Sequence, residues 1–473
     1  MKKIFSIIAL AVLAFSASAL DLPEIIGDNM MLQQQTNAKL WGWAKGGSTV
    51  QIVTSWNNQR YAVKADKQTG RWEVKVQTPA ASYETYSITV SGDNETKVLE
   101  NILIGEVWFC SGQSNMEMPL AGFWNCPVEG SNEAIATSGK YKKAIRVATI
   151  PKTDALVPQD KVGGKWQICE PQNAPRFSAA GYFFARTLTE LLDVPVGIIN
   201  CSWGGSCVEG WLPKEILEAY PDGLIPMDDT DYHRKMVMYN GMLHPLIGYT
   251  IKGFLWNQGE SNVGHETEYF DRFQTMTKLW REKWGQPDDK LPMYTVELPG
   301  WKYSGVDNDE CAKFREVQHK IAHTLENSAC VCTSDLIYDF EYDQIHATQK
   351  QQIGQRLAYI AAVRDYGMSG LWAENPEFEK METVNGEVIM YFTNAWDGFD
   401  RLQDIEGFEA AGDDGVFYPA RVWASNTESR TVLKLTCEKV PVVKNVRYCF
   451  KNFVVGKLHN SRQQPIVPFR TDK

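Results

Sequence analysis

Apolar and polar side chains alternate in short runs from residue 21 to about residue 100. Such runs cover 38–43, 49–53, 72–76 and 86–90, and Gly, Asn and Asp residues separate them. Alternation with a period of two is typical of strands that bury one face, and these separating residues favour turns. The pattern predicts a small sandwich-like β module in this part of the chain.

Wholly apolar runs replace the alternation beyond residue 101, and segments with helical periodicity lie between them. Strands buried on both faces of a parallel sheet have such runs, and strands alternating with helices are typical of an open α/β sheet. Residues 120–175 and 205–250 are less regular and are expected to form insertions or long loops near the functional site. The expected strands are 102–109, 194–201, 251–256, 293–298 and 329–333, and the expected helices are 179–192, 269–284, 312–325 and 351–366.

Strand patterning without long helices returns from about residue 375, which predicts a second β-rich region. The predicted fold class is therefore α/β, with an open parallel sheet that carries helices on both faces and β-rich regions at either end. We expect the N-terminal β module to cover 20–101. The α/β domain with its loop insertions should cover 102–372, and the C-terminal β-rich region should cover 373–473.

Residues 1–19 have the features of a secretory signal peptide and are not expected to belong to the fold. Lys2 and Lys3 begin the segment, an apolar run follows over 4–15, and Ala17-Ser18-Ala19 supplies small residues for cleavage. A retained membrane anchor is the alternative, but the apolar run is too short to span a bilayer comfortably. We expect an exported protein, periplasmic or secreted, with no membrane anchor after cleavage.

Composition narrows the function classes further. The formal net charge of -10 argues against a nucleic-acid partner, because binding nucleic acid requires clustered Lys and Arg side chains. Sixteen Trp and nineteen Tyr residues could offer flat apolar platforms for sugars, although ordinary packing explains most of them equally well. Nothing in the sequence indicates an oligomeric state.

All ten cysteines follow the predicted signal peptide, so an oxidising compartment would permit disulfides. Cys437 and Cys449 lie in adjacent strand-like runs and could close a hairpin, whereas buried free thiols are expected for most of the others. Because no Cys-x-x-Cys pair occurs, a structural zinc site is not expected.

Two glycine-containing polar clusters directly follow predicted strands, where the active sites of open α/β sheets gather. In 110–117, Gly112 permits a tight turn, and Ser114 would then head the next helix with its backbone N–H directed into a pocket. In 200–206, paired glycines let backbone N–H groups approach a ligand closely. Taken singly, a serine in a polar turn is more often a helix cap, and paired glycines are more often a tight turn.

Two further clusters supply side-chain chemistry. In 256–262, Gln258 offers an amide donor for an oxyanion, although a solvated loop explains this cluster equally well. Asp343 precedes His346 by three residues, which lets a carboxylate meet the imidazole Nδ1 while the other ring nitrogen takes a proton from a serine. Helix capping or half of a metal site would account for the same pair.

The order of these clusters resembles that of the SGNH hydrolases and, more closely, the sialate O-acetylesterase family. The resemblance covers nearly the whole chain after the signal peptide and implies an SGNH-type sheet in an esterase that needs no metal or organic cofactor. Its motifs are Gly-Gln-Ser-Asn-Met at 112–116, Trp-Gly-Gly at 203–205, Trp-x-Gln-Gly-Glu at 256–260 and Asp-x-x-His at 343–346.

The resemblance also implies residue roles. Ser114, Asp343 and His346 are implied to be catalytic, and the oxyanion hole is implied to use the N–H groups of Ser114 and Gly205 with the amide of Gln258. The Asn that the superfamily usually carries in its third motif corresponds here to Gln258 or Asn257; we take Gln258. The implied substrate is an O-acetylated carbohydrate, first of all an O-acetylated sialic acid, attacked through an acetyl-serine intermediate.

Side chains near the motifs are candidates for substrate binding. Arg176, in a loop before a predicted helix, is a candidate partner for a substrate carboxylate. His319 and His323 lie four residues apart on a predicted helix, but without a third ligand they are expected to be packed or solvated. The remaining candidates for contact with the sugar are Gln113, Asn115, Glu117, Trp203, Asn257 and Glu260.

Two other functions fit parts of this pattern. An acetylxylan esterase or another short-chain carbohydrate ester hydrolase of the same superfamily would carry the same motifs in a different pocket. A non-catalytic carbohydrate-binding protein would use the β-rich regions, but it would have no need for the complete set of Ser, Gly, Gln, Asp and His.

Overall fold

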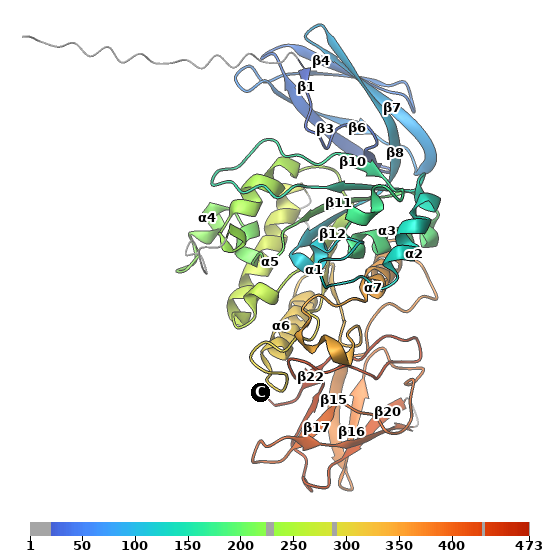
Figure 1. The fold of residues 1–473 in the computed structure, drawn as a ribbon, viewed down its shortest axis with the longest axis vertical. Helices are drawn as coiled ribbons and strands as arrows, with labels where there is room; N and C mark the ends of the chain where they lie inside the picture. Colours follow the sequence, from blue (N-terminus) through green and yellow to red (C-terminus); the bar gives the residue numbers. More distant parts are fainter. Residues whose placement is uncertain (1–19, 224–230, 286–290, 428–430, 473) are drawn as a thin grey trace, which may run out of the picture.

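The computed structural model describes residues 20–223, 231–285, 291–427 and 431–472. A mixed α/β body with a large sheet lies between two β-rich regions, one at each end of the long axis (Figure 1). Residues 1–19, the predicted signal peptide, lie outside the described part of the chain. Of the helices that are described, none has the length and apolarity needed to cross a membrane.

Strands form the N-terminal region, as the alternating pattern predicts, and they pair antiparallel except for β2, which pairs parallel with β8. One small sheet has the order β1-β3-β6, and its buried side chains include Leu40 and Trp41. The strands β2, β4, β5 and β7 instead belong to the large sheet. The bounds are β1 (Leu20–Asp21), β2 (Met31–Gln33), β3 (Asn37–Ala44), β4 (Thr49–Thr54), β5 (Arg60–Lys64), β6 (Arg71–Gln77) and β7 (Ser82–Gly92).

One long strand, β8 (Glu95–Gly112), connects the N-terminal region to the centre of the molecule. Its first half pairs antiparallel with β7, and its second half pairs parallel with β11 (Val196–Ser202) and β12 (Gly253–Asn257). The division expected at residue 101 therefore falls inside a continuous strand.

The central sheet has the strand order β10-β9-β11-β8-β12-β13-β14. Its strands are parallel except for β10, which runs antiparallel to β9 at one edge. Both edge strands lie in the segment 120–175, which was expected to be irregular. Strand β9 was not predicted because Arg146 interrupts its apolar run. The Arg146 guanidinium donates to the backbone oxygen of Lys142 at 2.6 Å. The remaining bounds are β9 (Ile145–Thr149), β10 (Trp166–Ile168), β13 (Met293–Val296) and β14 (Ser328–Val331).

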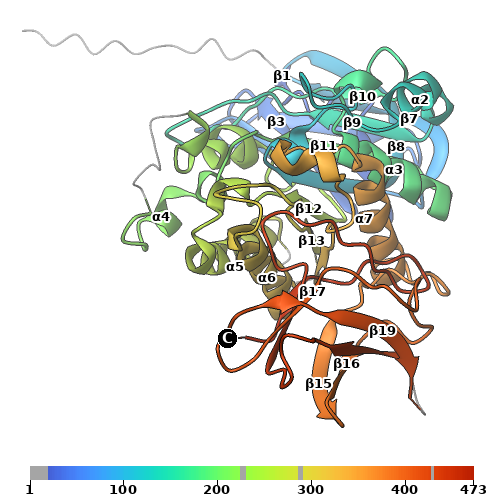
Figure 2. The same ribbon diagram turned by 60° about the horizontal axis from the view of Figure 1, so that its bottom comes forward.

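Helices cover both faces of this sheet (Figure 2). Neighbouring residues of a strand pack against different helices. On β12, Phe254 and Trp256 share a core with the side chains of α5 and α6, whereas Leu255 shares a core with those of α3 and α7. The four long helices are α3 (Ala179–Leu192), α5 (Glu266–Lys283), α6 (Glu310–Thr324) and α7 (Lys350–Arg364), and the short ones are α1 (Ser114–Glu117), α2 (Ser131–Thr137) and α4 (Lys214–Leu217).

The C-terminal region contains two four-stranded antiparallel sheets around a core of its own, with the orders β15-β16-β20-β19 and β18-β17-β21-β22. The hairpin disulfide considered for Cys437 and Cys449 is not formed, and all ten cysteines are unpaired. Cys437 follows β20 and Cys449 follows β21, so the two residues end strands of different sheets. The bounds are β15 (Phe378–Val384), β16 (Glu387–Phe392), β17 (Phe408–Ala411), β18 (Tyr418–Pro419), β19 (Arg421–Asn426), β20 (Thr431–Thr436), β21 (Asn445–Tyr448) and β22 (Phe469–Arg470).

Candidate active site

Three of the four polar clusters meet because their strands are neighbours in the sheet. Gly112, at the end of β8, lies level with Ser202 of β11 on one side and with Asn257 of β12 on the other. Gly112 has a φ of +134°, and a Cβ added to it would lie 2.1 Å from the backbone oxygen of Asn257. Only glycine fits this position, and the chain can therefore turn directly from β8 into α1.

Ser114 is the first residue of α1 and is half-buried. Gly204 lies against it, since a Cβ on Gly204 would be 3.3 Å from the Ser114 Cβ. Within the described chain, the backbone N–H groups of Ser114 and Gly205 donate no hydrogen bond. Helix capping does not explain the serine, because the capping position of α1 is Gln113.

The carboxylate of Glu117 fixes the glycine turn to α1. One oxygen accepts a hydrogen bond from the Gly204 N–H at 2.5 Å, and the other lies 2.8 Å from the Lys152 Nζ. The same Lys152 Nζ lies 6.0 Å from the ring centre of Trp203. Glu117, expected to touch the sugar, is thus already engaged on both oxygens.

The third cluster departs from the expected oxyanion donor. Gln258 is fully buried, and its amide nitrogen donates to the Ser206 backbone oxygen at 3.0 Å and to the Asn262 Oδ1 at 2.7 Å. Both of its N–H bonds are used, so the Gln258 amide is not a free donor. The neighbouring Asn257 side chain hydrogen-bonds to no described residue, and its Oδ1 is buried without a partner.

A buried network joins the serine turn, the third cluster and the histidine loop. The Asn115 Nδ2 donates to the Glu260 Oε1 at 2.5 Å and to the backbone oxygen of Ile345 at 3.1 Å, while its Oδ1 accepts from the Lys350 Nζ at 2.6 Å. Burial lowers the pKa of Lys350 to about 8 and raises the pKa of Glu260. Asn115 and Glu260 were expected to contact the sugar. In the structure they are buried and connect the serine turn to the histidine loop through hydrogen bonds.

Gln113 has a similar internal role. It is 3% exposed, and its Oε1 accepts hydrogen bonds from the backbone N–H groups of Gly259 and Ser261 at 3.2 and 3.4 Å. The side chain thus links the turn before Ser114 to the third cluster and, like that of Asn115, is buried.

His346 does not contact Asp343 in this structure. Its Nδ1 lies 3.6 Å from the Cys126 Sγ, and the backbone N–H of His346 donates to the Gln344 Oε1 at 3.4 Å. The Asp343 side chain is 52% exposed, and its nearest cationic partner is the Lys302 Nζ at 3.9 Å. Burial, with a smaller contribution from Lys350, lowers the pKa of His346 to about 4, so the imidazole is neutral at neutral pH.

A family model described as "Carbohydrate esterase, sialic acid-specific acetylesterase" matches residues 104–362, a range that contains all four clusters. The chain belongs to this family. Human sialate O-acetylesterase is 28% identical to it over 78% of this chain and 75% of the human protein, and the mouse enzyme is 26% identical over 98% and 97%. A crystal structure of a carbohydrate acetylesterase from Xanthomonas citri aligns with a TM-score of 0.85 and 30% identity, covering 96% of this chain and 100% of that chain.

The protein is accordingly a carboxylic ester hydrolase. Two of the candidate groups named from its sequence lie apart from the network described above. Arg176 lies in η2 (Ala174–Arg176), and its guanidinium pairs with no described residue. His319 and His323 bond to Glu297 and Glu377 at 2.7 and 2.8 Å, and among the residues with a defined placement no cluster of three or more His, Cys, Asp or Glu side chains could hold a metal.

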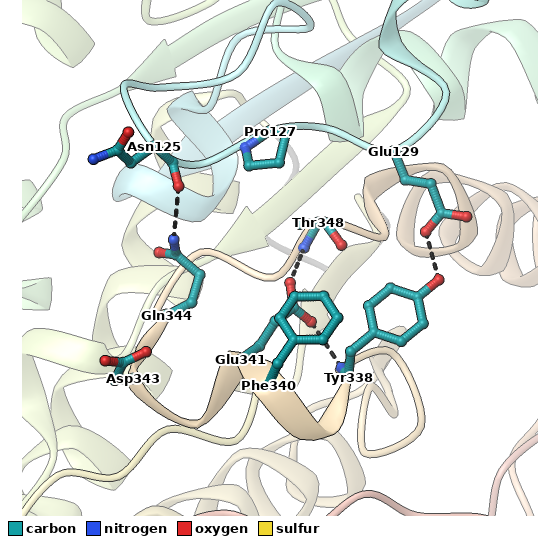
Figure 3. Close-up of a pocket in the computed structure, with 9 residues that line it drawn as sticks. All are labelled: Asn125, Pro127, Glu129, Tyr338, Phe340, Glu341, Asp343, Gln344 and Thr348. Carbon is teal, nitrogen blue, oxygen red and sulfur yellow. Dashed lines mark hydrogen bonds between the residues drawn. The ribbon is translucent and has the colours of Figure 1, made fainter.

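A cavity of about 520 Å³ adjoins the histidine loop of the esterase (Figure 3). The loop before α2 forms one wall, and η8 (Asp339–Asp343) with the residues around it forms the other. Of the lining residues, only Asp343 and Gln344 belong to a sequence motif. Asn125, Pro127 and Glu129, like Cys126 beside His346, belong to a segment with no recognisable pattern. The lining residues are Asn125, Pro127, Glu129, Tyr338, Phe340, Glu341, Asp343, Gln344 and Thr348.

Proposed function

We propose that this protein removes acetyl groups from O-acetylated carbohydrates and that Ser114 carries the acetyl group during the reaction. The observation that supports this most strongly is the position of Ser114 at the start of α1, against the Gly204 turn, with its own N–H and that of Gly205 both free of partners among the described residues. A nucleophile beside two unused backbone donors is the arrangement that acyl transfer requires.

In the proposed reaction, His346 takes the proton of the Ser114 hydroxyl as Oγ attacks the acetyl carbonyl carbon. The tetrahedral intermediate collapses, the ester C–O bond breaks, and His346 returns the proton to the departing sugar oxygen. Water then attacks the acetyl-serine with His346 again as the base, and acetate and free Ser114 result. The pKa of His346, lowered to about 4, leaves the imidazole neutral at neutral pH, and a carboxylate placed at Nδ1 would raise that pKa and strengthen the base.

The proposed orienting carboxylate is Asp343, turned from its place beside Lys302 towards the Nδ1 of His346. Glu341, a second carboxylate near His346 in the sequence, is not available for this role. Both of its oxygens already accept hydrogen bonds from backbone N–H groups, one from Thr348 at 3.0 Å and one from Tyr338 at 2.8 Å. Asp343 carries no such backbone bond and is half exposed, which leaves its side chain free to rotate.

The proposed oxyanion hole consists of the N–H groups of Ser114 and Gly205 with the amide of Asn257 as third donor. Asn257 replaces Gln258 in this role because both N–H bonds of the Gln258 amide are used internally, whereas the Asn257 amide is not. One such donor contributes about 3–4 kcal/mol to lowering the barrier.

Two substrate classes fit this chemistry. The names of the human and mouse relatives make O-acetylated sialic acid the first candidate, and acetylxylan or another neutral acetylated sugar is the second. A purely sugar-binding role is disfavoured by the unused N–H groups around Ser114, which serve no purpose without a reacting carbonyl. We also propose export through residues 1–19.

The test measures acetate release from O-acetylated sialic acid and from acetylated xylan, with the wild type, Ser114→Ala and the control Ser425→Ala in β19. We expect Ser114→Ala to lose turnover on every ester that the wild type cleaves, while Ser425→Ala keeps it. Wild-type turnover in Ser114→Ala, or binding of sugar by the wild type without any acetate release, would overturn the proposal.

A further inference from the structure

The cavity beside the histidine loop is lined by one of the proposed catalytic groups, Asp343, whereas Ser114 and His346 are not among its lining residues. Gln344 and Asp343 line it, and the Gln344 Oε1 accepts the backbone N–H of His346 at 3.4 Å. Its volume of about 520 Å³ lies in the range of about 300–1,000 Å³ that small-molecule sites occupy. The part of a substrate that extends from the acetyl ester would therefore find room here.

Two aromatic rings form one wall of the cavity (Figure 3). Tyr338 and Phe340 are stacked with their ring centres 5.4 Å apart and their planes 10° from parallel. Phe340 is 71% exposed, so one face of its ring is supported by Tyr338 and the other is open. A flat, rigid, apolar surface of this kind matches the C–H face of a sugar ring.

A polar acceptor lies at the edge of this aromatic pair. The Tyr338 hydroxyl donates to the Glu129 Oε2 at 2.8 Å, which orients that carboxylate along the cavity wall. The second oxygen of Glu129 bonds to no described residue and is available to accept a hydrogen bond from a sugar hydroxyl. Aromatic face and carboxylate together provide both kinds of contact that a sugar ring offers.

The charge of the cavity selects among sugars. Glu129, Glu341 and Asp343 line it, and no Lys, Arg or His is among the lining residues. Two cations outside the lining interact with these carboxylates: the Lys302 Nζ lies 3.9 Å from an Asp343 oxygen, and the buried Lys350 interacts electrostatically with Glu341. A sugar that carries its own carboxylate would enter a site lined by negatively charged side chains, which would repel it.

We propose that this cavity is a subsite for a neutral sugar ring, in which Phe340 and Tyr338 stack on the ring and Glu129 accepts a hydrogen bond from its hydroxyl groups. The proposal rests on the proposed function, because the ring is that of the ester attacked by Ser114. It decides between the two substrate classes: neutral acetylated sugars are the substrates, and O-acetylated sialic acid is a poor one.

The test compares kcat and KM on p-nitrophenyl acetate, glucose pentaacetate, acetylated xylo-oligosaccharides and O-acetylated sialic acid. The wild type is expected to have a higher kcat/KM on the neutral sugars than on sialic acid. Phe340→Ala is expected to raise KM for the neutral sugar esters about tenfold and to lower their kcat/KM more than that for p-nitrophenyl acetate. The matched control is Trp396→Ala, an exposed aromatic 61% accessible in the C-terminal region, which should alter none of these constants.

A second variant tests the charge argument. Glu129→Gln keeps the shape of the side chain and removes one negative charge, so the ratio of kcat/KM on sialic acid to that on neutral sugar should rise several-fold. A wild-type preference for sialic acid over both neutral esters would overturn the proposal, as would a Phe340→Ala variant that slows all four substrates by the same factor.

Binding measured by calorimetry separates this proposal from the catalytic one. Titration of the full chain with xylotetraose should give a Kd about tenfold weaker in Phe340→Ala than in the wild type, and sialyllactose should bind more weakly than xylotetraose. A Ser114→Ala variant that still cleaves esters would overturn the proposed function and leave these binding results intact. Equal affinities of the wild type and Phe340→Ala would overturn the subsite even if Ser114 proves to be the nucleophile.

Discussion

The side-chain amide of Asn115 donates a hydrogen bond to the backbone oxygen of Ile345 at 3.1 Å. Asn115 follows Ser114 and Ile345 precedes His346, so this one bond fixes the positions of the two groups proposed to exchange a proton. Asn115, the donor, is 1% exposed. The donor end of the bond is thus held in the interior, while Ile345 is partly exposed.

Asn115→Ala should therefore reduce both stability and activity. The variant leaves the Lys350 ammonium and the Glu260 carboxyl buried without a partner, which costs about 2–3 kcal/mol of unfolding free energy. It also frees the loop that carries His346, so kcat should fall more than KM rises. Urea denaturation and steady-state kinetics measure the two effects, and Asn132→Ala, an exposed position on α2, is the control; equal results for the two variants would contradict this account.

The acid limb of the pH–rate profile should report His346. Its pKa is lowered to about 4, so the base is neutral above that value, and kcat/KM should fall only as the pH drops through about 4. Lys350→Met removes the nearby positive charge, raises the pKa of His346 and moves the limb to higher pH, whereas Lys313→Met on α6 should leave it in place. Because kcat/KM reports the free enzyme, this prediction applies to the state in which Asp343 lies beside Lys302. A wild-type limb near the ordinary histidine value of about 6.5 would contradict it and would show that Asp343 already engages Nδ1 before substrate binds.

Asn257 and Gln258 should respond differently to truncation. Asn257→Ala should lower kcat about 10²–10³-fold with little change in KM or stability, because it removes a donor used in the transition state. Gln258→Ala should lower the urea midpoint, because it leaves the Ser206 carbonyl unpaired in the interior and removes one of the two hydrogen bonds to the Asn262 Oδ1, which keeps the bond from the Val208 N–H. The reverse pattern, with a stable but inactive Gln258→Ala, would return the donor role to Gln258.

Gly205 should tolerate no side chain. It has a φ of +81°, and an added Cβ would lie 2.7 Å from the Tyr232 ring. Gly205→Ala is expected to displace its N–H and reduce kcat at least tenfold. The control is Gly386→Ala, where the backbone is equally unfavourable, with a φ of +83°, but the added Cβ would meet open space. This variant should lose some stability and keep full activity. Equal activity losses in the two variants would show that backbone strain alone causes the effect.

The sequence predicts the central sheet well because its strands are buried on both faces. Runs such as Phe254-Leu255-Trp256 have no alternation, and the structure indeed packs their neighbouring residues into two different cores. Strand β9 escapes prediction because Arg146 breaks its apolar run, and only the tertiary structure shows that its charge is satisfied by backbone oxygens. The hairpin disulfide fails for a similar reason, since sequence neighbours can belong to different sheets.

Some of the site residues could likewise be placed from the sequence, and others could not. Ser114 and Gly205 could be brought together from the sequence because parallel strands place their carboxyl ends at one edge. Asn115 and Glu260 were expected to touch the sugar, but the structure buries them. A motif shows which polar groups gather, and it does not show whether water reaches them. Their burial, like the contact between Cys126 and His346, depends on segments more than a hundred residues apart.

The most direct measurement is the identification of the acetylated residue during turnover. Rapid acid quenching of the enzyme with p-nitrophenyl acetate, followed by peptide mass spectrometry, should find an acetyl group on the peptide that contains Ser114 in the wild type and none in Ser114→Ala. Steady turnover with no acetylation of Ser114, or an acetyl group on another residue that disappears at the catalytic rate, would contradict the central claim that Ser114 is the nucleophile.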